Sequence, residues 1–522
     1  MKMHGRLKVK TTAQQEAERK AHREEKLKTY QTAMSAIFAN REALKNASSS
    51  DEISEEDTIK IQQALMKMTA GVLMANPDIS TLWNIRKEVL GKALITLDST
   101  PVEHDLVLKK ELDLTFQCLQ NNPKSYGAWY HRCWSMLKMK SPKWDQELRL
   151  CNDYLKLDGR NFHCWDHRRF VTQHAGISVE EELTYSKEDL IDVNFSNYSA
   201  WHYRSKLLPL AEGCGSNGKI SEAQRMAELE SVQSAAFTDP NDSSAWFYLQ
   251  WLLGRSDDVL KPIKAEYDGK KLMVAFSRNL ASTDIQISIS DSSIDDVTWR
   301  SVNGLRYDSL WIAENISKDT LIRISVKGND EDVLEVPQTG CFVLSKPKLC
   351  DTDFSTFQIL EKQLEDCEQL LEFETDPTLN PEPGNSVKWI TYTKILIMLK
   401  MDPQKYYKDI IKGFEDLCQI DPSRKGYYKD QRSKVIIDNV FSTDPNRKEI
   451  DLSNQGLTSV AYFNQLFAFA HKLNISKNDI KSVKSLMPYL VNCKVLHSDF
   501  NRDDILAEVT DTKTTENMKI MP

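Results

Sequence analysis

We predict a mostly α-helical protein, built as an alpha-solenoid of stacked helix hairpins with an inserted Ig-like β-sandwich and a C-terminal leucine-rich repeat domain. Three observations in the 522 residues predict this fold. A tryptophan-centred pattern recurs along the chain, a strand-like stretch interrupts it, and a second period of 23 residues appears near the C-terminus. The expected domains are 1–257 and 351–445 for the two parts of the helical domain, 258–350 for the sandwich, and 446–522 for the leucine-rich repeats and tail.

Each copy of the tryptophan pattern has Asn or Asp seven residues before Trp, and Arg three residues after it. Because Asn and Asp are favoured helix N-caps and Pro often follows them here, we interpret each copy as the start of a helix. The Trp and the Arg then share one helix face, where Trp fills the gap between hairpins and Arg ties adjacent repeats together. The four full copies and a fifth copy without the Arg contain Trp83, Trp129, Trp165, Trp201 and Trp246.

The intervals between these tryptophans are 46, 36, 36 and 45 residues, which is too irregular for a tetratricopeptide array. Helix-like stretches, such as 102–119 and 145–156, lie between the copies. The repeating unit is therefore a helix hairpin that stacks on its neighbours.

The interruption after Trp246 reads as strands. Apolar residues recur at every second position over several short runs that are separated by Asp, Ser, Asn and Gly turns. Two of these runs carry Leu272, Val274, Phe276 and Ile322, Ile324, Val326. We interpret residues 258–350 as a small antiparallel β-sandwich that serves as a scaffold or docking surface.

The 23-residue period is the leucine-rich repeat pattern, in which regularly spaced aliphatic residues line the inside of each coil. Leu452, Leu457 and Val460 recur as Ile475, Ile480 and Val483. Because a domain of so few leucine-rich repeats is only marginally stable alone, we expect it to pack on the helical body.

Composition excludes several classes of protein. The formal net charge of −8 disfavours a general nucleic-acid binder, because phosphate binding needs a concentrated positive surface. No window approaches eighteen consecutive apolar residues, so we expect no transmembrane segment. The N-terminus has no apolar signal region, and the ten cysteines form no CxxC pair. We therefore expect a cytoplasmic protein with reduced thiols.

A candidate site lies at the position five residues before Trp. Lys124 and Arg160 occupy it in two adjacent repeats, where we expect the first turn of a helix and a cation opposes the helix macrodipole. Two cations together with exposed helix amides would bind an anion such as diphosphate. Tyr126 and His163 are close enough in sequence to add donors. The alternative, that Lys124 and Arg160 are ordinary surface charges, stays open.

No complete active site is evident. His163 and His167 have the i, i+4 spacing of metal ligands, but no HExxH context accompanies them, so we expect them to pack between helices. The chain has no nucleophile elbow and no phosphate-binding glycine loop.

The repeat resembles that of the protein prenyltransferase alpha subunits, whose hallmark is a Trp with Asn-Pro or Asp-Pro upstream and Arg downstream. The segments 124–134 and 161–170 match it closely. The sandwich, the leucine-rich tail and the opening segment 3–10 resemble the branch of the family that modifies Rab GTPases.

This resemblance implies a heterodimer in which a beta subunit carries zinc while the alpha solenoid wraps around it. It implies transfer of geranylgeranyl from geranylgeranyl diphosphate to C-terminal cysteines of Rab GTPases that an escort protein presents. The family role carried to Lys124 is contact with the diphosphate, with Tyr126 assisting. Arg160 and His163 are weaker candidates for the same contact. A further hypothesis is that His4, near the terminus, reaches the zinc of the partner.

Two other classes remain. One is the alpha subunit shared by farnesyltransferase and type I geranylgeranyltransferase, which lacks the two extra modules. The other is a non-catalytic helical-repeat scaffold that only binds proteins.

Overall fold

The computed structural model describes residues 12–47, 54–96, 100–212, 220–254, 260–289, 292–293, 297–314, 322–336, 339–343, 354–379, 384, 386–500 and 518–521. Packing within the chain defines two compact units, Met1–Asp189 and Leu190–Pro522. His4 lies outside the described residues. The chain is mostly helical, as predicted.

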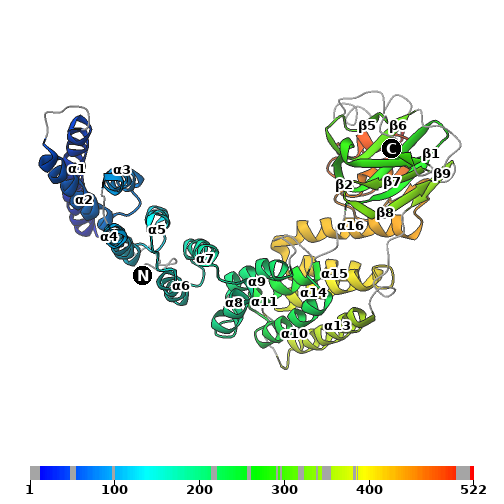
Figure 1. The fold of residues 1–522 in the computed structure, drawn as a ribbon. Coiled ribbons are helices and arrows are strands. Elements are labelled where there is room, and N and C mark those ends of the chain that lie inside the picture. The colour runs from blue at the N-terminus through cyan, green and yellow to red at the C-terminus, as the bar shows by residue number, and fades with distance from the viewer. Residues whose placement is uncertain are drawn as a thin grey trace. The chain divides into compact units, whose positions relative to one another are not determined.

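The first unit consists of helices that pair into hairpins (Figure 1). A capping box between Thr100 and Glu103 precedes α4, and Gly176, whose φ of 68° suits glycine, caps the C-terminus of α7. The predicted helices 102–119 and 145–156 are confirmed as α4 and α6. The unit contains α1 Ala13–Ala47, α2 Glu55–Ala75, α3 Ser80–Thr96, α4 Pro101–Asn121, α5 Tyr126–Lys138, α6 Trp144–Leu157, α7 Phe162–Ala175 and α8 Val179–Tyr185.

The second unit continues the hairpin pattern after the π-helix Ser186–Ile191. Its pairs are α10 with α11, α13 with α14, and α15 with α16, so the helical repeats resume after the strands. The helices are α9 Tyr198–Ala211, α10 Glu222–Thr238, α11 Ser243–Gly254, α13 Phe354–Thr375, α14 Ser386–Met401, α15 Tyr407–Ile420 and α16 Lys425–Thr443.

Two antiparallel sheets form the predicted sandwich, with strand orders β5-β6-β2-β1-β9 and β4-β3-β7-β8. The alternating residues that predicted it, such as Leu272, Val274 and Ile324, lie in one core between the sheets. The strands are β1 Pro262–Tyr267, β2 Lys271–Ala281, β3 Ile285–Ile289, β4 Ser292–Ser293, β5 Trp299–Ser301, β6 Tyr307–Glu314, β7 Ile322–Val326, β8 Asn329–Val336 and β9 Gly340–Val343.

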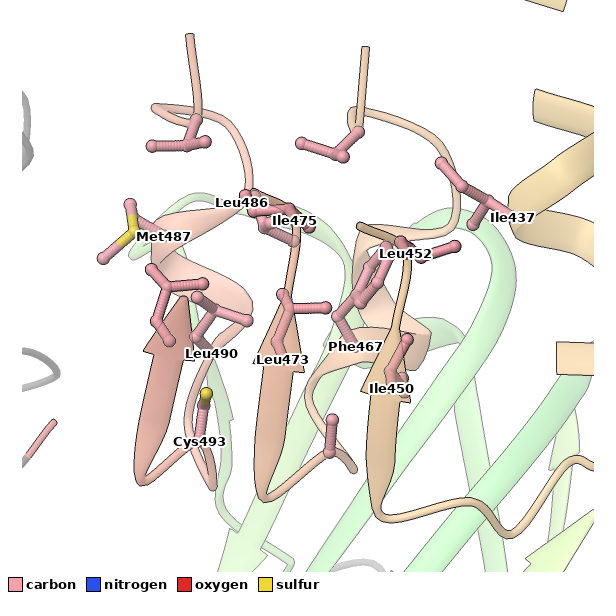
Figure 2. Close-up of a cluster of buried hydrophobic side chains, with 14 of the residues drawn as sticks. Ile437, Ile450, Leu452, Phe467, Leu473, Ile475, Leu486, Met487, Leu490 and Cys493 are labelled. Carbon is pink, nitrogen blue, oxygen red and sulfur yellow. The ribbon is translucent and has the colours of Figure 1, made fainter. Parts of the chain in front are cut away.

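The C-terminal part forms a parallel sheet whose strands follow the 23-residue period. Glu449 pairs with Lys472, and Lys472 pairs with Val495. The strands are β10 Glu449–Asp451, β11 Lys472–Asn474, β12 Val495–His497 and β13 Lys519–Met521, and the short helix α17 spans Asn464–Phe467. We call this C-terminal part (449–500 and 518–521) the coil. Figure 2 shows apolar side chains that fill its interior, with Ile437 of α16 beside them. The expected packing on the helical body is therefore confirmed at α16.

The coil also packs on the sandwich, which we did not predict. Met273 and Ala275 of β2 share a second core with Phe469 and Tyr489. β2 is therefore buried on both faces, since its alternate residues face the sandwich core. Tyr489 adds a 2.8 Å hydrogen bond from its hydroxyl to Oδ1 of Asp308 in β6.

Candidate functional site

The turn between the helices of each repeat has one recurring geometry. Its first residue is the Asn or Asp of the repeat pattern, and its side-chain oxygen accepts the backbone N–H two residues later. The tryptophan indole N–H donates across the turn to the carbonyl six residues before it, at 2.8 to 3.0 Å in the five copies. The buried indole thus fills the gap, as predicted, and also fixes the turn.

This geometry corrects the predicted start of the helices. We expected Asn122 to cap α5, with Lys124 in its first turn. Asn122 instead ends α4, and the N-cap of α5 is Ser125. Arg160 likewise precedes Asn161, the N-cap of α7. Both cations therefore lie in the turn rather than in the helix, so the macrodipole penalty does not apply to them.

From the sequence we expected backbone N–H groups at the helix starts to bind an anion. The capping side chains already accept hydrogen bonds from some of these groups. The Ser125 hydroxyl accepts the N–H of Ala128, and the Asn161 side chain accepts those of His163 and Cys164. An anion at this edge would therefore be bound mainly by side chains.

Lys124 lies beside the turn of the next repeat. Its Nζ is 3.3 Å from Oδ2 of Asp158, and about half of the lysine side chain is exposed. The other oxygen of Asp158 accepts the backbone N–H of Arg160 at 3.1 Å. The two predicted cations therefore belong to turns that one carboxylate connects, and Arg160 is exposed.

Tyr126 and His163 meet across the same two repeats. Their rings are perpendicular with centroids 4.2 Å apart, while Tyr126 is 70% exposed and His163 is buried. Burial lowers the pKa of His163; the nearby Asp166 opposes this effect, and Lys124 reinforces it. The imidazole is thus neutral at pH 7 and can donate one hydrogen bond.

Behind this edge, buried carboxylates bind the repeats together. Glu147 of α6 accepts two hydrogen bonds from Arg132 of α5, at 2.7 and 2.6 Å, and lies 2.9 Å from Nε2 of His167 of α7. The predicted role of the repeat Arg is confirmed, and the expected packing role of His167 is confirmed as well. Equivalent sets are Arg86 with Glu111 and His131, and Arg204 with Glu228 and Tyr248.

The site thus brings together three predicted residues, Lys124, Tyr126 and His163. Arg160 lies in the neighbouring repeat turn, which begins with Asp158. Sequence reasoning missed Asp158. One signal was available, because this repeat has a charged Asp at a position where its neighbours have Asn122 and Asn194. Within the described residues, no three His, Cys, Asp or Glu side chains form a group that could hold a metal ion.

Comparisons with known proteins place the repeats in a family. The family model of the protein prenyltransferase alpha subunit repeat matches residues 108–139, 144–175, 179–210 and 226–256. The chain is 35% identical to the geranylgeranyl transferase type-2 subunit alpha of Sus scrofa, over 99% of this chain and 91% of that protein. It is 35% identical to the Homo sapiens protein of the same name, over 97% of this chain and 89% of that one.

A solved structure of Candida albicans protein geranylgeranyltransferase-I complexed with GGPP matches 78% of this chain and 91% of its own. At 17% identity and a TM-score of 0.44, that likeness carries no argument. Among the described helices, none is both long and apolar enough to cross a bilayer.

Proposed function

The chain belongs to the family of geranylgeranyl transferase type-2 alpha subunits, and from this membership we propose how it takes part in the reaction. It acts as a heterodimer with a beta subunit. The dimer transfers geranylgeranyl from geranylgeranyl diphosphate to C-terminal cysteines of Rab GTPases. The observation that carries this chain's part is the side-chain cluster around Lys124 on the edge of the second and third repeats.

Lys124 is the proposed contact for the diphosphate. As the bond to the isoprenoid breaks, negative charge grows on the leaving diphosphate, and an ammonium group beside it lowers the barrier. The exposed hydroxyl of Tyr126 donates a further hydrogen bond. Arg160 and His163 are secondary contacts, because Arg160 is exposed in the neighbouring repeat turn and His163 lies under the Tyr126 ring.

From the family resemblance we assign the zinc of the proposed enzyme to the beta subunit. In the described part of this chain, no three His, Cys, Asp or Glu side chains fit such an ion. Zinc would supply a deprotonated cysteine of the Rab substrate as the nucleophile. This chain's residues act on the other reactant, the diphosphate.

Exposed aromatic side chains mark the proposed contact with the beta subunit. In the first unit, Tyr126 and Phe162 are neighbours with centroids 6.1 Å apart. In the second unit, the ring centroid of the exposed Phe247 lies 5.9 Å from that of the exposed Tyr198 and 5.1 Å from that of the half-buried Trp389, which gives one row over α9, α11 and α14. Tyrosine and tryptophan anchor many protein interfaces, so these rows suit a large permanent partner.

The proposed escort protein needs a separate surface. A groove of about 560 Å³ lies between α10 and α13, and its lining includes Phe237, Lys362 and Asp366. The lining is mostly polar and charged, and its apolar residues are Phe237 and Leu370. Such a polar surface suits a transient partner, so we propose it as the contact for the escort protein. We also keep the cytoplasmic location as a proposal, supported by the free thiols of the eight described cysteines.

Lys124→Ala is expected to slow geranylgeranyl transfer by about 10- to 100-fold, or about 1.4 to 2.8 kcal/mol, because the leaving diphosphate loses a charge contact. The heterodimer should still form, because the change leaves the aromatic residues of the proposed beta-subunit contact in place. Single-turnover transfer to a Rab is the measurement. Lys138→Ala, an exposed lysine at the other end of α5, is the control. An unchanged rate for Lys124→Ala would remove this lysine from the mechanism.

Co-expression with a type-2 beta subunit tests the function itself. Transfer of labelled geranylgeranyl to a Rab only in the presence of escort protein is the expected result. Transfer to a C-terminal CaaX peptide without the escort would favour the shared alpha subunit of farnesyltransferase and type I geranylgeranyltransferase. Failure to co-purify with a beta subunit would favour a non-catalytic scaffold.

A further inference from the structure

Asp158 carries a charge that its turn does not need. In all five repeat turns the first residue accepts the N–H two residues later, at 3.1 or 3.2 Å. Three of these turns use a neutral amide oxygen, at Asn76, Asn122 and Asn194. Asparagine at position 158 would therefore form the same turn, so the charge of Asp158 is available for a second contact.

That charge is directed at Lys124. Asp158 uses Oδ1 for the turn and places Oδ2 3.3 Å from Nζ of Lys124. The carboxylate is held by the backbone of its own repeat, while the lysine is a long, half-exposed side chain from the repeat before. The lysine is thus the mobile partner of the pair, and the aspartate is the fixed one.

We infer that Asp158 is a counter-ion that sets how tightly the site holds diphosphate, because its carboxylate competes with the diphosphate for the Lys124 ammonium group. This inference rests on the proposed contact between Lys124 and the diphosphate. A diphosphate that enters must displace the carboxylate from Lys124 and also approach a negative charge. Both effects weaken binding of the substrate and of the diphosphate released as product, and weak product binding favours turnover.

The test uses the complete heterodimer and inorganic pyrophosphate as the probe. Asp158→Asn keeps the turn and removes the charge, so pyrophosphate should bind about two- to fivefold more tightly, the range of a partly exposed ion pair. Titration calorimetry measures this affinity, and inhibition of transfer by pyrophosphate should strengthen by the same factor. Equal or weaker binding by Asp158→Asn would overturn the inference.

Asp239→Asn is the matched control. Asp239 begins the fifth repeat turn and accepts the N–H of Asn241 at 3.2 Å, but within the described residues it has no ion pair. The preceding repeat has Ser196 where the second repeat has Lys124. The control should bind pyrophosphate like the unmodified dimer. Equal tightening in both variants would mean that general negative charge, rather than competition for Lys124, explains the effect.

A double substitution separates this inference from the proposed function. On a Lys124→Ala background, Asp158→Asn should lose most of its effect, because the two residues act through one contact. If Lys124→Ala alone leaves pyrophosphate affinity unchanged, the proposed diphosphate contact fails. If Lys124→Ala weakens binding but Asp158→Asn does not strengthen it, only the role of Asp158 fails.

Discussion

Glu147→Ala is expected to destabilise the first unit by about 3 to 5 kcal/mol, the cost of removing one partner from a buried ion pair. The substitution leaves the guanidinium of Arg132 buried without its carboxylate, and it takes the partner of Nε2 from His167. Arg132 is tied to α4 as well, since it donates to the Leu112 carbonyl and the Thr115 hydroxyl. The loss should therefore loosen α4 to α7 together.

Hydrogen exchange of the α6 and α7 amides in the full-length chain is the measurement, because it reports local opening without requiring two-state unfolding of the whole protein. Asp145→Ala is the control: it breaks an exposed pair with Arg149 on the same helix and should cost less than about 1 kcal/mol. Glu147→Gln keeps the shape of the side chain without its charge, so its loss of stability should lie between those of Glu147→Ala and Asp145→Ala. Equal protection in Glu147→Ala and Asp145→Ala would contradict the bridging role.

Acid should weaken the same contact. Burial raises the pKa of Glu147, but the His167 hydrogen bond and the Arg132 charge outweigh burial and lower the pKa to about 2 from its ordinary 4.5. The ionised carboxylate thus stabilises the fold above pH 4.5, and this contribution is lost as the pH falls toward 2. Burial lowers the pKa of His167, which adds to the loss because the unfolded chain takes up that proton more readily.

The repeat Arg could be predicted from the sequence, but its glutamate could not. Trp and Arg stand in one helix at fixed spacing, so the pattern repeats along the chain. The glutamates belong to the next helix, and they follow their arginines by 25, 15, 14 and 24 residues. Because hairpin lengths differ, no period connects the two charges, and only the packed fold brings them together.

The predicted start of the helices that carry the repeat Trp was wrong for a related reason. Asn122 and Ser125 are both good capping residues, three positions apart, and Pro123 suits the first turn of a helix that Asn122 would cap. Sequence alone does not decide which residue ends one helix and which starts the next. The proposed diphosphate contacts, Lys124 and Tyr126, do not depend on this choice, because they flank Ser125 whichever residue is the cap.

The sequence of β2 contained a weak indication that this strand also packs on the coil. The run Leu272 to Phe276 is apolar at every position, which is typical of a strand buried on both faces rather than of a strand with one solvated face. We used only its alternate residues, so the sandwich core was predicted and the face that packs on Phe469 and Tyr489 was missed.

Asp308→Ala is the second change expected to have a large effect. It should destabilise the β5–β6 hairpin by more than about 3 kcal/mol and, through Tyr489, weaken the contact between sandwich and coil. Asp308 is fully buried. It accepts four backbone N–H groups, from Val302, Asn303, Ser309 and Leu310, at 2.7 to 3.3 Å, and the Tyr489 hydroxyl. Each buried donor left without an acceptor costs about 1 to 3 kcal/mol.

Two further variants separate the contribution of the Tyr489 hydrogen bond from that of the backbone hydrogen bonds to the buried carboxylate. Tyr489→Phe removes the hydroxyl that donates to Asp308, leaves the four backbone contacts of that carboxylate in place, and should cost about 1 kcal/mol. Asp268→Ala also removes a carboxylate that accepts two backbone N–H groups, but that turn is exposed and water can replace the oxygen, so the cost should stay small. For all three variants, the measurement is hydrogen exchange of the backbone amides of β5, β6 and residue 489 in the full-length chain. If Asp308→Ala opened β5 and β6 while leaving protection at Tyr489 unchanged, Asp308 would stabilise only its own hairpin, and the contact between sandwich and coil would depend on the apolar contacts of Met273, Ala275 and Phe469 alone.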